Sequence, residues 1–126
     1  MPHVKLSPPP DLAVLHRTFR PRTLREGELV IKLEECWLAS REHSLLVECH
    51  VIEGTLRQSF YLALHCDEDA ASVRLLPRTS PEKTSGVLRA IVWLARCLEA
   101  RGGTAITVTN LQAPLAIPFR VEDVAP

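Results

Sequence analysis

Residues 45–66, LLVECHVIEGTLRQSFYLALHC, contain two runs of alternating apolar and polar side chains, separated by a glycine. Such alternation is typical of half-buried strands, and glycine readily adopts the positive φ of a tight hairpin turn. With Glu53-Gly54 as the loop, the apolar pairs on one face are Val51 with Leu56, Val47 with Phe60, and Leu45 with Leu62. A slip of one residue would move these side chains to the wrong face, so the pattern predicts an antiparallel hairpin.

Segments on either side extend this hairpin into a larger sheet. Residues 28–39 (ELVIKLEECWLA) alternate at first, and a bulge near Glu35 would turn that side chain outward while keeping Trp37 buried. Residues 72–77 and 104–110 are further strands, and the stretch between them predicts a long helix. The helix signals are Ser80 as N-cap, Pro81 in the first turn and Gly102-Gly103 after the last turn.

The expected fold is therefore α+β. We expect a four- to five-stranded antiparallel meander, in the order β-β-β-β-α-β, with one face covered by the long helix. This arrangement buries the apolar face of the sheet in two layers.

The two ends of the chain are rich in proline and are expected to form segments distinct from this core domain. The sequence leaves open whether residues 1–26 pack on the core or on a partner. Residues 10–19 (PDLAVLHRTF) predict a short helix that stops before Pro21, after an extended proline-rich lead. Pro114 and Pro118 restrict the last segment to a sheet edge or an extended strap. We therefore divide the chain into an arm (1–26), a core domain (27–113) and a strap (114–126).

Composition limits the class of protein. The 126 residues suit one domain, and 15 basic and 15 acidic residues show no overall bias toward nucleic acid. No apolar run approaches the ~18 residues of a membrane helix, so no membrane partner is expected. Four cysteines without a C-x-x-C spacing, and no signal-peptide pattern, predict a cytoplasmic protein with reduced thiols.

Cys49-His50 and His65-Cys66 raise the question of a metal site or a Cys/His nucleophile. In the predicted hairpin the two histidines lie roughly 26 Å apart, whereas zinc ligands share an ion at about 2.0–2.3 Å. The cysteines face the core, where burial raises the pKa of a thiol. The chain also lacks the glycine-rich phosphate loops and hydrolase motifs, so we expect no metal, cofactor or catalytic residue.

Binding candidates are polar or aromatic residues outside the expected core. They belong to the arm, to the outward face of the hairpin, and to the exposed side of the long helix, where a bordering tryptophan favours an interface. The candidates are Arg17, Arg20, Arg22, Arg25, His50, Arg57, Tyr61, Arg89, Trp93 and Arg96.

Three functions remain open. The first is a non-catalytic protein-interaction module (adaptor, chaperone-like or regulatory) that acts as a homodimer or within a complex. The second is a single-stranded nucleic-acid-binding protein that uses the arginine arm and the polar sheet face. The third is a small enzyme with an intersubunit site built from His50, His65 or Glu48.

Overall fold

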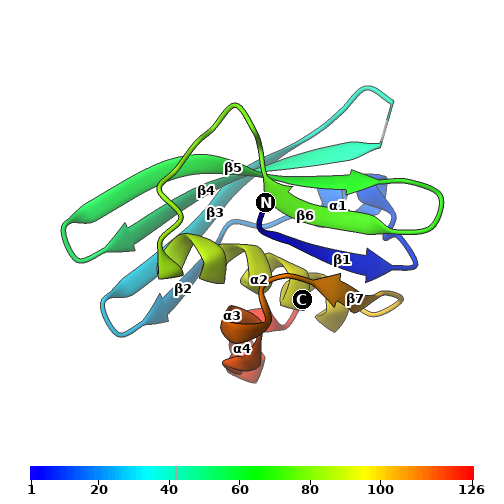
Figure 1. Ribbon diagram of the computed structural model, residues 1–126. Coiled ribbons are helices and arrows are strands. Elements are labelled where there is room, and N and C mark those ends of the chain that lie inside the picture. Colours follow the sequence, from blue (N-terminus) through cyan, green and yellow to red (C-terminus); the bar gives the residue numbers. More distant parts are fainter. Residues whose placement is uncertain (42) are drawn as a thin grey trace.

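The computed structural model describes residues 1–41 and 43–126 and has an α+β fold (Figure 1). Its elements are β1 (His3–Ser7), α1 (Leu12–Thr18), β2 (Arg22–Glu26), β3 (Leu29–Leu38), β4 (Ser44–Glu53), β5 (Leu56–Cys66), β6 (Ala71–Leu75), α2 (Ser85–Ala100), β7 (Ala105–Thr109), α3 (Gln112–Ala116) and α4 (Val121–Val124). The strands form one antiparallel sheet in the order β2-β3-β4-β5-β6-β1-β7, which curls around α2 (Figure 1). No helix in this described part of the chain is long and apolar enough to cross a membrane.

The central hairpin is present as β4 and β5, but its register differs from the predicted one by two residues. Cys49 lies opposite Phe60 and Val47 opposite Leu62, because the turn is Gly54-Thr55 rather than Glu53-Gly54. Gly54 has φ 61°, the left-handed conformation that such a turn requires. A shift by two keeps every side chain on its face, so the predicted inward and outward sets remain correct.

The predicted number of strands is too low, because the sequence pattern does not reveal the two short strands before residue 27. Val4 and Leu6 of β1 are fully buried, and β1 lies between β6 and β7. β2 pairs with β3 and buries only Leu24 among polar neighbours. Two inward-facing residues in β1 and one in β2 are too few to show a recognisable alternation of apolar and polar side chains. The predicted short helix is confirmed as α1, with the Asp11 carboxylate accepting from the Val14 N–H at 3.2 Å.

The bulge in β3 exists, but it has the opposite effect on Trp37. The register shifts between Leu33 and Cys36, and Glu35 is exposed as expected. One inserted residue reverses the alternation after it, so Cys36 faces the core and Trp37 faces outward. Trp37 is 44% exposed, which corrects the prediction that it is buried.

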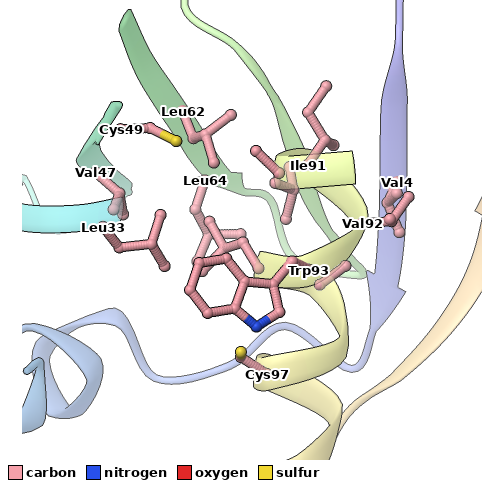
Figure 2. Close-up of a cluster of buried hydrophobic side chains, with 14 of the residues drawn as sticks. Val4, Leu33, Val47, Cys49, Leu62, Leu64, Ile91, Val92, Trp93 and Cys97 are labelled. Atoms are coloured by element: carbon pink, nitrogen blue, oxygen red, sulfur yellow. The ribbon is translucent and has the colours of Figure 1, made fainter. Parts of the chain in front are cut away.

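The long helix α2 begins at Ser85, four residues later than expected. Thr84 is its N-cap, and the Glu53 carboxylate accepts hydrogen bonds from the Thr84 hydroxyl and from the Gly86 N–H. Residues before Thr84 bond to β5 instead, since the Gln58 side chain pairs with the backbone of Glu82. Figure 2 shows side chains of α2 facing the buried apolar residues of β1, β3, β4 and β5.

The last segment contains two short helices rather than an extended strap. α3 and α4 both contact α2, on the side away from the middle of the sheet (Figure 1). Pro114 lies inside α3, and Pro118 follows it. The Trp93 indole N–H donates to the carbonyl oxygen of Asp123 at 2.8 Å, which fixes this segment on α2.

Candidate interaction surface

The sheet has one filled face and one open face. α2 packs inside the curl, and Leu15 of α1 and the following Phe19 lie on the same side as Leu33 and Leu45 of the sheet. The outer face of β3, β4 and β5 therefore carries no covering helix in the described chain (Figure 1). We call these outward side chains the outer face. They are Val30, Lys32, Glu34, Trp37, Leu46, Glu48, His50, Ile52, Arg57, Ser59, Tyr61 and Ala63.

An aromatic pair occupies one part of the outer face. The rings of Trp37 and Tyr61 meet edge to face, with centroids 5.8 Å apart and an interplanar angle of 64°. Leu46 lies opposite Trp37 on the neighbouring strand, and both Leu46 and Tyr61 are only half-buried. The pair thus presents large apolar area with fixed orientation, because each ring restricts the other.

Arg74 borders the aromatic pair. It lies opposite Ala63, which in turn lies opposite Leu46, so one row of side chains joins Trp37 to Arg74 across four strands. The Arg74 Nε is buried and has no hydrogen-bond partner within the described residues. A buried donor without a partner is uncommon and indicates an environment that an additional acceptor would complete.

The middle of the outer face is polar and contains a chain of three hydrogen-bonding groups. His50 Nδ1 lies 2.7 Å from the Ser59 hydroxyl, and His50 Nε2 lies 3.5 Å from a Glu48 carboxylate oxygen. A serine, a histidine and a carboxylate are the three types of side chain that many acyl-transfer enzymes use together. Such chemistry also requires donors aimed at the developing oxyanion, whereas strand N–H groups point along the sheet toward neighbouring strands.

His65 does not join this group. Its Nδ1 lies 2.8 Å from the Ser44 hydroxyl, at the far end of the same strands. The residues considered for an enzyme are therefore divided between two separate serine–histidine contacts. Arg57 lies opposite Ile52 near the turn, not opposite His50 as the predicted register implied.

The arginines of residues 1–26 do not form one basic surface. Arg25 of β2 is exposed and lies opposite Val30 of β3, so it faces outward. Arg22 lies opposite the buried Leu33, so it is on the other face of the sheet. Arg20 and Arg22 lie at the mouth of a cavity beside α1, and Arg17 is an exposed residue of α1 that does not contact it. The arginine cluster expected from the sequence is thus split between both faces of the sheet.

The helix residues predicted to be exposed are largely internal. Arg89 is 5% exposed and Trp93 is 1% exposed, so neither is available to a partner. The physical reason is that α3, α4 and the segment between them cover the side of α2 that a simple two-layer fold leaves open. Arg96 is partly exposed and paired with Glu99 at 2.6 Å.

The four cysteines are free thiols at inward positions, as hairpin parity predicts for Cys49 and Cys66, whereas the bulge in β3 is what turns Cys36 inward. Burial raises the pKa of Cys49 strongly and that of Cys97 to about 11. Cys36 and Cys66 are half-buried, and desolvation raises the pKa of both. All four thiols are therefore protonated and weakly nucleophilic near neutral pH.

Comparisons of the chain with protein-family models, with curated proteins and with solved structures find no match.

Proposed function

We propose that the protein is a non-catalytic interaction module that self-associates through the outer face. The observation that carries this proposal is Trp37, a large aromatic side chain that is 44% exposed and packed edge to face against Tyr61 on an open sheet. Trp, Tyr and Arg are the residues most enriched in energetically important interface positions. Trp37, Tyr61 and Arg74 bring all three types together on one patch.

A second copy of the chain fits this face. A two-fold interface uses the same patch on both subunits, so the patch must tolerate itself. The charged residues of the outer face have both signs: Lys32 and Arg57 are basic, and Glu34 and Glu48 are acidic. The face therefore does not repel its own copy, and its apolar centre is removed from water when two copies meet.

Sedimentation velocity over a range of protein concentrations tests the proposal. The wild-type chain is expected to form dimers, and Trp37→Ala is expected to weaken the dimer at least ~30-fold, the effect of a typical interface hot spot. Val108→Ala is the matched control, because Val108 is 55% exposed but lies on the edge strand β7. A wild-type chain that stays monomeric, or a Val108→Ala chain that dissociates as readily as Trp37→Ala, would contradict the proposal.

Single-stranded nucleic acid is a second candidate occupant of the same face. The Trp37–Tyr61 pair offers two aromatic rings for base stacking, where the sequence alone indicated one. The division of the arginines between the two sheet faces removes the electrostatic support expected from the arm. Salt-sensitive binding of oligothymidylate by wild type, lost in Trp37→Ala, would favour this candidate over self-association.

We also propose a cytoplasmic location, because four free thiols suit a reducing compartment.

A further inference from the structure

A cavity of about 350 Å³ lies on the concave side of the sheet, between α1, β3–β5 and the second half of α2. This volume is within the range of small-molecule sites. Its inner wall consists of buried apolar side chains, of which Leu33, Val47, Leu64 and Cys97 are visible together in Figure 2. Leu15 of α1 and Phe19, which directly follows α1, form the opposite wall, so the interior of the cavity is mostly apolar.

Three arginines lie around this cavity: Arg20, Arg22 and Arg101. Their hydrogen-bond partners are neutral. Arg22 donates to the Cys97 sulfur at 3.4 Å and to the Asp123 carbonyl oxygen at 2.9 Å. Arg101 donates to the Thr18 hydroxyl at 2.5 Å, and Arg20 to the Phe19 carbonyl oxygen at 3.1 Å.

The acidic side chain that acts on this cavity is paired elsewhere: burial, and after it the Asp123 carboxylate, raises the pKa of Cys97 in the cavity wall, but the ion-pair partner of Asp123 is Arg120. Within the described residues, no ion pair involves any of the three arginines around the cavity, and no acidic side chain lines it. The Cys97 thiol adds no negative charge near neutral pH, because burial raises its pKa to about 11. Positive groups beside apolar walls attract an anion more strongly than they would in bulk water.

We propose that this cavity binds an aliphatic carboxylate of medium chain length. The hydrocarbon chain lies between α1, the sheet and α2, and the carboxylate accepts hydrogen bonds from the arginines at the mouth. Arginine suits this role because its planar donor fork matches a carboxylate, and its charge strengthens each hydrogen bond. The cavity is on the opposite side of the sheet from the outer face, so this site is independent of self-association.

Titration calorimetry with decanoate, in the full-length chain and below the micelle concentration, tests the site. We expect saturable binding, and ~fourfold tighter binding for each methylene added from hexanoate to decanoate. Decanol has the same chain without the charge, and it is expected to bind at least ~tenfold more weakly. Absence of saturable decanoate binding, or equal affinity for decanol, would overturn the proposal, and neither outcome depends on a variant that folds.

Two variants then locate the carboxylate. Arg20 and Arg101 are exposed, so the double substitution Arg20→Met and Arg101→Met leaves the buried core unchanged. The double variant is expected to bind decanoate at least ~tenfold more weakly than wild type and to bind decanol with unchanged affinity. Arg17→Met is the control, because Arg17 is an exposed arginine of α1 that does not line the cavity. The affinity of this variant for decanoate should stay within ~twofold of the wild-type affinity. An unchanged decanoate affinity in the double variant, or an equal loss in Arg17→Met, would overturn the assignment to these arginines.

Discussion

Arg89 is a charged residue in the middle of the long helix that is 5% exposed. Its Nε and Nη2 donate to the two carboxylate oxygens of Glu26, at 3.0 and 2.8 Å. Its Nη1 and Nη2 also donate to the carbonyl oxygens of Pro114, Ile117 and Pro118, and its guanidinium lies 3.5 Å from the centre of the Phe119 ring. One side chain thus joins α2 to β2 and to the C-terminal segment.

Replacement of Arg89 by methionine keeps the apolar stem and removes these bonds. We expect the free energy of unfolding to fall by about 2–3 kcal/mol, below the usual cost of breaking a fully buried pair because Glu26 is about one-third exposed. Arg96→Met on the same helix removes a more exposed pair with Glu99 and should cost less than ~1 kcal/mol. Urea denaturation measures both, and equal losses would contradict the role assigned to Arg89.

The buried thiols predict how stability depends on pH. The pKa of Cys97 is about 11 in the folded chain and 9.0 as its ordinary value, and the pKa of Cys49 is raised further. A group with a raised folded pKa contributes stability below its unfolded pKa and loses it as the pH rises. We expect the free energy of unfolding to fall above pH 9.0, by at most ~1.4 kcal/mol per pH unit for each thiol.

The test is urea denaturation under reducing conditions from neutral pH to pH ~10.5, where the thiols of the unfolded chain ionise. Substitution of Cys49 and Cys97 by alanine lowers stability at every pH through the cavities left behind, but it should make the decline above pH 9.0 less steep. An identical decline in wild type and variant would show that other groups cause it.

At the level of elements, the start of α2 depends on a close contact that only glycine permits. A Cβ on Gly86 would lie 2.6 Å from the Glu53 carboxyl carbon and 2.8 Å from Leu29 Cδ1. Glu53 cannot easily move away, because it accepts hydrogen bonds from Thr84 and from Gly86 itself. This contact connects the end of β4 to the first turn of the helix.

Gly86→Ala should therefore destabilise the chain despite the higher helix propensity of alanine. We expect a net loss of about 1–2 kcal/mol from crowding, partly offset by the propensity gain. Ser85→Ala, at the exposed neighbouring position, has the propensity gain without the crowding and should be neutral or slightly stabilising. Thermal unfolding followed by circular dichroism distinguishes the two, and a stabilised Gly86→Ala chain would contradict the account.

The sequence predicts long, strongly patterned elements better than short ones. The hairpin faces and α2 are recognisable because alternation or helical periodicity extends over many positions. The short helix α1 is recognisable from Asp11 at its start and Pro21 beyond its end. β1 and β2 have too few apolar positions for a period, and their place in the sheet depends on pairing with distant strands. The predicted helix start is wrong because Glu53, far away in sequence, selects Thr84 over Ser80 as the N-cap.

At the scale of the whole molecule, the curled sheet creates two different surfaces. The concave side holds α2 and a cavity with arginines at its mouth, while the convex side presents an aromatic pair. His50, Arg57 and Tyr61 could be placed outside from hairpin parity alone. Trp37 could not, because its face depends on the number of residues inserted by the bulge, and Arg89 and Trp93 could not because α3 and α4 cover them.

The two tryptophans of the chain allow a direct test of self-association through the outer face. Trp37 is 44% exposed on that face, whereas Trp93 is 1% exposed and its indole N–H is bonded to the Asp123 carbonyl oxygen. We would record the two indole N–H resonances by NMR from about 10 µM to about 1 mM protein, a range that includes weak dimers. We expect the Trp37 resonance to move with protein concentration and the Trp93 resonance to stay constant. A Trp37 resonance that does not move over this range would show that the outer face is not a self-association surface.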